Sequence, residues 1–162
     1  MIRLIAAIDE ERGIATASGI PWHLRGDSAY FRAETETGLI VMGSSTYTEF
    51  AAPLHDRVNY VLTSKPGPLR AGFEPVADLD DVTRAFPSDD VWVIGGAAIY
   101  AATIGRADQL FLTQVAGDFR CTKFFPPYAD AFDRVARGED REEHGTVYRF
   151  EQWRARPPII AG

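Results

Sequence analysis

The sequence predicts an α/β protein in which helices cover both faces of a mostly parallel β-sheet. Short apolar runs rich in β-branched residues alternate with segments of helical spacing, an order typical of α/β folds. The run Val91-Trp92-Val93-Ile94 is apolar at consecutive positions, as expected of a strand buried on both faces. The connections between successive parallel strands are therefore expected to be right-handed crossovers.

Apolar runs bounded by Gly, Pro, Asp or Ser are the expected strands. They occupy residues 4–8, 39–42, 58–63, 91–94 and 109–115. Helices are expected between them at residues 24–36, 44–50, 79–86 and 97–104. In the first helix, Leu24, Asp27 and Phe31 fall along one side with Glu34 or Thr35, close to i, i+3/i+4 spacing. The third helix begins in an Asp-rich stretch, and acidic residues favour a helix N-terminus.

The end of the chain has a different pattern. Residues 134–138 and 146–153 are candidate strands, and the charged span 138–145 between them is expected to be an exposed turn. Such a pair adds an antiparallel edge to a parallel sheet, which is a common arrangement. Pro157-Pro158 predicts a frayed tail over residues 157–162. Residues 1–162 as a whole have the length of one domain.

Composition places the chain among ordinary globular proteins. The 17 basic and 23 acidic residues give a net charge of −6, which argues against a nucleic-acid or anionic-membrane partner. No apolar run approaches the ~18 residues of a membrane span, and the N-terminal run is too short for a signal peptide. The lone cysteine, Cys121, permits no intrachain disulfide. A cytoplasmic location and a monomeric state are expected.

Asp27 is the first residue with a candidate chemical role. It shares the apolar side of the first helix with Leu24 and Phe31, where an unpaired charge is costly. Either the carboxylate faces a pocket and meets a cationic or amide-like edge of a ligand, or it only complements the dipole of the helix N-terminus. The spacing alone leaves both interpretations open.

Two glycine-containing strand ends and one arginine are further candidates. The segment Val41-Met42-Gly43-Ser44-Ser45-Thr46 could present backbone N–H groups to a phosphate, or could be an ordinary hydroxyl N-cap. Gly95-Gly96 could permit close approach of a ligand to the backbone, or could form only a tight turn. Arg57 could bind a carboxylate through its guanidinium, or could be a solvated charge.

Other common chemistries are not supported. His23, His55 and His144 lack metal-ligand spacing, and neither H-E-x-x-H nor C-x-x-C occurs, so no metal is expected. The sequence contains no G-x-S-x-G nucleophile elbow and no G-x-x-x-x-G-K-[ST] phosphate loop. Gly95-Gly96 is not part of a G-x-G-x-x-G motif, so a standard Rossmann site is not expected.

Several motifs follow one another in a specific order along residues 1–127. They are Leu4-Ile5-Ala6-Ala7, Ile20-Pro21-Trp22 followed by Asp27 and Phe31, Val41-Met42-Gly43 with Thr46, Leu54 and Arg57, Leu62-Thr63-Ser64, Val93-Ile94-Gly95-Gly96 with Ile99-Tyr100, Leu112-Thr113, and Phe125-Pro126. In this order they resemble the dihydrofolate reductase family. The resemblance implies an eight-stranded, mostly parallel sheet with an antiparallel C-terminal edge strand, flanked by four helices. It also implies NADPH-dependent reduction of 7,8-dihydrofolate to 5,6,7,8-tetrahydrofolate in one-carbon metabolism.

The resemblance assigns catalytic roles to Asp27, Thr113 and Tyr100. Asp27 would accept hydrogen bonds from the pterin and favour protonation of its imine nitrogen through water, and Thr113 would hydrogen-bond to Asp27. Arg57 would bind the α-carboxylate of the glutamate tail. The substrate site implied in this way consists of Ile5, Asp27, Phe31, Phe50, Leu54, Arg57, Ile94 and Thr113.

The resemblance also assigns a site for NADPH. Its apolar members would line the nicotinamide, the Ser44 and Ser45 amides with Thr46 would hold the pyrophosphate, and residues 62–65 would border the adenosine. Gly95-Gly96 corresponds to the cis peptide of the family. The full cofactor set is Ala7, Ile14, Ile20, Gly43, Ser44, Ser45, Thr46, Leu62, Thr63, Ser64, Lys65, Gly95, Gly96, Ala97, Ala98 and Ile99.

The chain departs from the family pattern at positions that concern the cofactor and one loop. Ser44 and Ala98 stand where the family usually has basic residues that favour the 2′-phosphate or the pyrophosphate. Ser64 and Lys65 then remain as candidate ligands for the 2′-phosphate. Cys121-Thr122-Lys123 replaces the Gly-Asp-Thr that usually precedes Phe-Pro and that joins two loops by hydrogen bonds.

Two other interpretations are compatible with parts of the pattern. Another pteridine or pyrimidine reductase of the same fold, such as the reductase of riboflavin biosynthesis, is disfavoured because Asp27 with Arg57 suits a pterin head and a glutamate tail. A degenerate, non-catalytic nucleotide-binding protein is suggested by Ser44 and Ala98. It is disfavoured because a protein that only binds need not keep an acid in an apolar wall.

Overall fold

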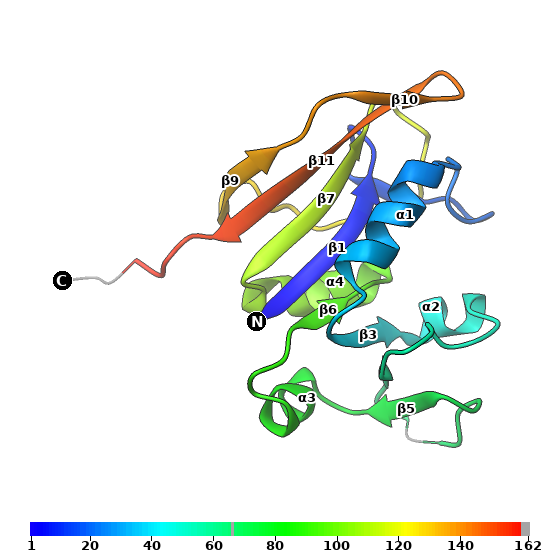
Figure 1. Ribbon diagram of the computed structural model, residues 1–162, viewed down its shortest axis with the longest axis vertical. Coiled ribbons are helices and arrows are strands. Elements are labelled where there is room, and N and C mark those ends of the chain that lie inside the picture. Colours follow the sequence, from blue (N-terminus) through cyan, green and yellow to red (C-terminus); the bar gives the residue numbers. More distant parts are fainter. Residues whose placement is uncertain (66, 160–162) are drawn as a thin grey trace.

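A nine-stranded sheet forms the centre of the protein (Figure 1). The computed structural model describes residues 1–65 and 67–159. The strands follow the order β10-β11-β7-β1-β6-β3-β4-β5, and β9 also pairs with β11. Their bounds are β1 (Ile2–Ile8), β3 (Leu39–Gly43), β4 (Asn59–Leu62), β5 (Phe73–Val76), β6 (Val91–Val93), β7 (Gln109–Val115), β9 (Phe132–Arg137), β10 (Arg141–Glu143) and β11 (Thr146–Ala155). A separate two-stranded sheet joins β2 (Gly13–Ala15) to β8 (Lys123–Phe124).

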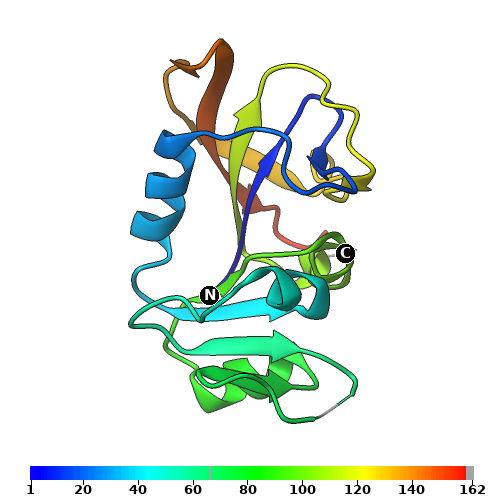
Figure 2. The same ribbon diagram turned by 90° about the vertical axis from the view of Figure 1, so that its right-hand side faces the viewer.

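Four α-helices lie on the two faces of the sheet, among the described residues. They are α1 (Arg25–Glu34), α2 (Ser44–Glu49), α3 (Leu79–Ala85) and α4 (Ala97–Thr103), and a short 3-10 helix, η1 (Ile104–Arg106), follows α4. Aromatic side chains of α1 and α2 pack on one face, while α3 and α4 pack on the other. Figure 2 shows α1 and α4 on opposite sides of β1. The predicted fold class is therefore confirmed.

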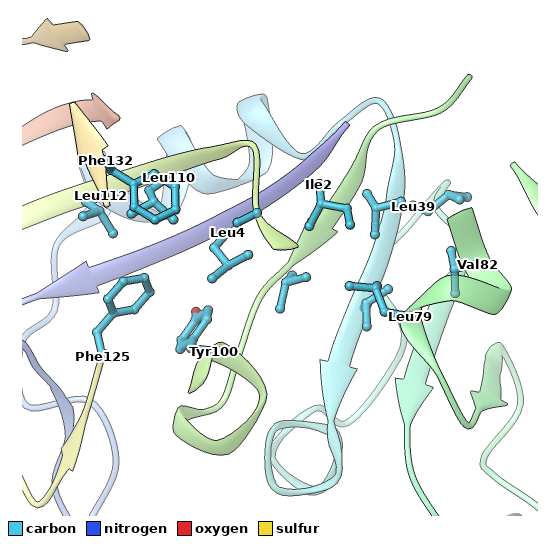
Figure 3. Packing of buried hydrophobic residues seen from close by; sticks show 14 of the residues in the cluster. Ile2, Leu4, Leu39, Leu79, Val82, Tyr100, Leu110, Leu112, Phe125 and Phe132 are labelled. Atoms are coloured by element: carbon cyan, nitrogen blue, oxygen red, sulfur yellow. The ribbon is translucent and has the colours of Figure 1, made fainter. Parts of the chain in front are cut away.

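Successive side chains of a strand point to opposite faces of the sheet and so contribute to two core layers. In β3, Leu39 and Val41 belong to the layer under α3 and α4, whereas Ile40 and Met42 belong to the layer under α1 and α2. Trp92 of β6 likewise points to the second layer, between neighbours that point to the first. Because both faces are covered, consecutive residues are buried, which explains the uninterrupted apolar runs. Figure 3 shows the first layer, with Leu4, Tyr100 and Phe125 among its residues.

The C-terminal part differs from the expectation in two respects. The sheet has nine strands in the described residues rather than eight, and β11 lies inside it, between β7 and β10, rather than at its edge. The predicted turn at 138–145 is wrong in part because it contains β10, which pairs antiparallel with β11. The turn between them is shorter, at His144 and Gly145, where both φ angles are positive (51° and 79°). Two-residue turns of this kind match the twist of a hairpin.

Three short strands lack a clear sequence pattern. β2 and β8 have only three and two residues, too few to show alternation. β5 contains Pro75 and lies at the edge of the sheet, where a missing N–H donor is tolerated. The other predicted strands are confirmed with shifts of one or two residues, and 109–115 has the predicted bounds.

The chain after β11 contains no element as far as residue 159. Residues 160–162 of the predicted tail lie outside the described residues. Within residues 1–65 and 67–159, no helix is both long and apolar enough to cross a membrane.

Candidate active site

A cavity of about 470 Å³ opens where β1, β3 and β6 end, between α1 and α2. In open α/β sheets, ligands bind at the carboxyl ends of the strands. The cavity brings together many residues that the sequence assigned to a site. Of the predicted substrate and catalytic residues, Ile5, Asp27, Phe31, Phe50, Leu54, Ile94, Tyr100 and Thr113 line it. Of the predicted cofactor residues, Ala7, Ile14, Ile20, Ser45, Thr46, Gly95, Gly96 and Ala97 line it.

Asp27 and Thr113 form a hydrogen-bonded polar pair in the cavity wall, which also contains the apolar residues Ile5, Phe31 and Ile94. Asp27 lies in the first turn of α1 and Thr113 on β7. The buried hydroxyl of Thr113 donates a 2.6 Å hydrogen bond to Oδ1 of Asp27. Asp27 thus occupies the helix N-terminus and also faces the cavity, so the two interpretations of its position are compatible. As a residue of the cavity wall, Asp27 can meet an amide-like edge of a ligand.

The surroundings of Asp27 favour its neutral form. Burial raises the pKa of its carboxyl above the usual range, the hydrogen bond from Thr113 lowers it, and the negative charge of Glu143 raises it further. Burial is the largest of these effects because it removes water from the charged form. A carboxyl whose pKa is shifted toward neutrality is suited to proton chemistry.

Tyr100 closes the inner wall of the cavity. Its side chain is buried, and its hydroxyl donates a 2.6 Å hydrogen bond to the backbone carbonyl of Ile5. Burial and the charge of Asp27 both raise the pKa of Tyr100, so the phenol remains neutral. Tyr100 therefore fixes β1 against α4 beside the reacting region.

The part of the cavity where the predicted cofactor residues lie contains small residues and hydroxyl groups, among them Ser45, Thr46, Gly95 and Gly96. The Gly95–Gly96 peptide is cis, as the resemblance implied. The Gly43 N–H donates a 2.7 Å hydrogen bond to the Gly95 carbonyl, which joins the ends of β3 and β6. A Cβ on Gly96 would lie 3.2 Å from Oγ of Ser45. The Gly95–Gly96 backbone therefore lies directly against the side chains of Ser45 and Thr46.

Other predicted cofactor residues lie next to the cavity rather than in its wall. Gly43, Ser44 and residues 62–65 stand at the ends of β3 and β4, where Gly43 pairs with Leu62. Ile99 packs closely against Gly43, because a Cβ added to Gly43 would lie 2.4 Å from Cγ1 of Ile99. Ala98 begins α4 with Ala97 but is not part of the wall.

Arg57 is also outside the wall. Its guanidinium donates a 3.4 Å hydrogen bond to the backbone carbonyl of Arg32, a residue that does line the cavity. Its buried Nε has no hydrogen-bond partner among the described residues. An unpaired buried donor is costly, so an acceptor on a ligand would be stabilising there.

Six cavity residues were not assigned by the sequence. They are Ala6, Ala15, Ser28, Arg32, Glu49 and Lys123. Ser28 and Arg32 follow from helical spacing once Asp27 and Phe31 are known, and Glu49 lies one turn after Thr46. Lys123 has no such local signal because only the pairing of β8 with β2 brings it there.

The loops after β1 and β7 are joined by groups other than the family's Gly-Asp-Thr. The Thr122 N–H donates a 2.9 Å hydrogen bond to the Ala15 carbonyl. Asp9, 1% exposed, accepts hydrogen bonds from the Gly13 N–H (2.7 Å) and the Phe119 N–H (3.0 Å). Cys121 is a buried free cysteine, and burial raises the pKa of its thiol, which makes it less reactive. No three His, Cys, Asp or Glu side chains in the described residues are placed to hold a metal ion.

Known proteins share both the sequence and the fold of this chain. The model of the family named dihydrofolate reductase matches residues 1–155. The dihydrofolate reductase of Bacillus subtilis (strain 168) is 35% identical over 153 residues, which cover 93% of this chain and 91% of that protein. The dihydrofolate reductase of Staphylococcus aureus is 29% identical over 127 residues, covering 78% and 79%. The structure of dihydrofolate reductase from Enterococcus faecalis complexed with NADP(H) and RAB-propyl aligns with a TM-score of 0.85, at 23% identity and with 97% of each chain covered. The chain therefore belongs to the dihydrofolate reductase family.

Proposed function

We propose that the protein reduces 7,8-dihydrofolate to 5,6,7,8-tetrahydrofolate with NADPH in this cavity, and that Asp27 is the central catalytic residue. The observation that supports this most directly is the hydrogen-bonded Asp27–Thr113 pair in the wall of the cavity. A charged or polar pair of this kind orients a small planar ligand. Membership of the family supplies the reaction, and the geometry supplies the residues that would carry it.

Asp27 binds the pterin head and favours its protonation. Its carboxylate accepts hydrogen bonds from the 2-amino group and the adjacent ring nitrogen, which fixes the orientation of the ring. The negative charge favours the protonated imine, and the proton arrives through water because the acid does not reach that nitrogen. Thr113 holds Asp27 by its hydroxyl, and Phe31, Phe50 and Ile94 enclose the ring.

Arg57 binds the α-carboxylate of the glutamate tail. Its buried Nε is without a partner in the described part of the chain, and its guanidinium is held near the cavity through the Arg32 carbonyl. A planar guanidinium pairs with a carboxylate through two hydrogen bonds. Leu54 lies in the wall between this position and the pterin pocket.

NADPH would bind in the opposite half of the cavity. When bound, NADPH supplies the hydride for the reduction. Ala7, Ile14 and Ile20 offer an apolar surface for its nicotinamide. Thr46 with the Ser44 and Ser45 amides would hold the pyrophosphate, and residues 62–65 would border the adenosine.

We also propose that the enzyme is a single domain that acts as a cytoplasmic monomer and binds no nucleic acid. The net charge of −6 supports the last point. The buried free thiol of Cys121 supports a reducing compartment.

A spectrophotometric assay of NADPH oxidation tests the proposed reaction. Purified protein should oxidise NADPH only when dihydrofolate is added. A ribosylaminopyrimidinone substrate is the informative control, since turnover of that compound instead would assign the cavity to the riboflavin-pathway reaction. Binding of NADPH without turnover of either compound would indicate a non-catalytic nucleotide-binding protein.

A further inference from the structure

Helix α1, which carries Asp27, begins without a cap of its own. The first N–H groups of a helix have no partners within the helix and need acceptors from outside it. The N-cap residue is Leu24, whose extended backbone (φ −120°, ψ 106°) is normal for a cap but whose side chain makes no cap hydrogen bond. Leucine has no acceptor to offer, so the first turn depends on another part of the chain.

Glu143 supplies the missing acceptors from more than 100 residues away. Its Oε1 accepts a 2.9 Å hydrogen bond from the Arg25 N–H, and its Oε2 accepts a 3.0 Å hydrogen bond from the Gly26 N–H. Both oxygens of the carboxylate therefore bind the residues that directly precede Asp27. A negative charge at this end of a helix is also favoured by the helix dipole.

The carboxylate of Glu143 is itself held rigidly by the sheet. Glu143 ends β10 and pairs with Thr146 of β11 across the two-residue turn. The buried hydroxyl of Tyr148 donates a hydrogen bond to Oε2 of Glu143, and Tyr148 pairs with Val115 at the end of β7. Figure 1 shows this β10–β11 hairpin beside the N-terminal end of α1. Glu143 thus connects α1 to β7, the strand that carries Thr113.

The fit leaves no space at Gly26. A Cβ on this residue would lie 2.2 Å from the Tyr148 hydroxyl oxygen and 3.0 Å from Oε2 of Glu143. A side chain would push α1 away from the hairpin. Glycine is needed at this position because Glu143 approaches the backbone closely.

We infer that Glu143 is a positioning residue for the reduction: from β10 it caps α1 and thereby fixes the Asp27 carboxyl against Thr113. This inference rests on the proposed function of Asp27. Glu143 touches neither the cavity nor the reacting groups, and it acts through the backbone of Arg25 and Gly26.

The charge of Glu143 adds a measurable effect on Asp27. The hydrogen bond from Tyr148, followed by that from Gly26, lowers the pKa of Glu143 and keeps it ionised. Its negative charge in turn raises the pKa of Asp27. The charge of Asp27 acts on three tyrosines, Tyr30 of α1, Tyr100 of α4 and Tyr148 of β11, and raises the pKa of each.

Charged side chains are also present around Asp27. Arg32 of α1, Glu49 of α2 and Lys123 of β8 share the main cavity, while His23 and Arg25 border an outer groove beside Asp27. All of these remain unchanged when only Glu143 is replaced. A comparison of single variants therefore isolates its contribution.

The test compares Glu143→Gln with Glu142→Gln, which removes the same charge from the neighbouring, exposed residue of β10. The titration of the Asp27 carboxyl carbon, followed by NMR in the ligand-free protein, needs no turnover. We expect Glu143→Gln to lower its midpoint by about half a pH unit, since a partly screened like charge is lost. The pH at which kcat declines should move the same way. Glu142→Gln should leave both unchanged.

Two outcomes overturn the inference. If Glu143→Gln titrates like Glu142→Gln and differs from wild type only in Tm, Glu143 is a structural cap without influence on Asp27. If Glu143→Gln does not fold, Glu143→Asp replaces it in the test, because aspartate retracts the carboxylate by one methylene. A titration midpoint of Asp27 equal to that of the wild type in Glu143→Asp would also overturn the inference. A wild-type protein that does not oxidise NADPH with dihydrofolate instead contradicts the proposed function.

Discussion

The Thr113 hydroxyl donates a 2.6 Å hydrogen bond to Oδ1 of Asp27, although 86 residues separate the two in the chain. The contact fixes Oδ1 of the carboxylate against β7. It also opposes the effect of burial on the pKa of Asp27. One hydrogen bond thereby contributes to both the orientation and the proton affinity of the proposed catalytic group.

Asp27→Asn should lower kcat by about 10²–10⁴-fold at pH 7, the range typical of general acid–base assistance. The amide keeps the shape of the carboxylate but does not favour the protonated imine. The loss should become smaller at low pH, where the substrate arrives already protonated. Steady-state kinetics from pH 5 to 8 measure both effects, and near wild-type activity at pH 7 would remove Asp27 from the mechanism.

The same substitution should stabilise the protein at neutral pH. Burial is the main reason that the pKa of Asp27 is raised in the folded state. The protonated carboxyl therefore contributes stability below the unfolded pKa of 3.8. This contribution is lost as the pH rises through the folded pKa. At pH 7 the buried charge opposes folding, and Asn removes it. The gain should be about 0.5–2 kcal/mol. Thermal unfolding at pH 7 and pH 4 checks this, because the gain should be clearly smaller at pH 4, where the folded carboxyl is more protonated than at pH 7.

Thr113→Val should shift the pH dependence in the direction opposite to Glu143→Gln. The hydroxyl lowers the pKa of Asp27, so its loss should raise the midpoint of the Asp27 titration and move the decline of kcat toward higher pH. Valine has the same shape as threonine without the donor, and the site is buried. An Asp27 midpoint at or below the wild-type value would show that the hydrogen bond does not stabilise the carboxylate.

The fold is predictable where burial on both faces leaves a local signature. Val91–Val93 and Leu39–Gly43 are buried at every position, and their apolar runs predict central strands directly. β8 has two exposed residues and therefore no apolar pattern at all. β10 is charged throughout, Arg141-Glu142-Glu143, and only its pairing with β11 makes it a strand.

The sequence predicts the individual residues of the site better than it predicts the contacts between them. Asp27 is marked by its place on an apolar helix face, and Thr113 by its place in a strand. Their hydrogen bond depends on how α1 packs against β7, which no local spacing encodes. Glu143 and Lys123 reach α1 and the cavity through β10 and β8. Both were missed for the same reason, since only long-range pairing places them.

Arg57→Leu should raise KM for dihydrofolate by about tenfold or more while changing KM little for a pterin without the glutamate tail. A charge-assisted bidentate contact is roughly twice as strong as a neutral one, and 1.4 kcal/mol corresponds to about tenfold in affinity. Arg84→Leu, on the exposed surface of α3, is the matched control. Equal effects on both substrates would show that Arg57 supports the fold through its contact with Arg32 and does not bind the glutamate tail.

We expect cofactor preference to depend on Lys65, because Ser44 and Ala98 stand where the family usually has basic residues. The 2′-phosphate of NADPH carries up to two negative charges, which donors and cations must balance. Lys65 follows the end of β4, next to the strand from which Ser44 and Ser45 emerge. Its backbone N–H donates a 3.1 Å hydrogen bond to the Thr63 hydroxyl, which orders this turn. We therefore expect Lys65 to provide the main cationic contact.

Lys65→Ala should weaken NADPH binding by about 1–3 kcal/mol, the range for hydrogen bonds to charged groups, and should leave NADH binding nearly unchanged. Lys65→Arg keeps the charge and should keep most of the preference. Dissociation constants from fluorescence titration measure both cofactors without turnover. The NADPH advantage of the wild type should fall as salt rises, because exposed charges are screened. If Lys65→Ala weakens both cofactors equally, or neither, Lys65 does not discriminate between them. Equal use of NADH and NADPH by the wild type would show instead that Ser44 and Ala98 have relaxed the preference.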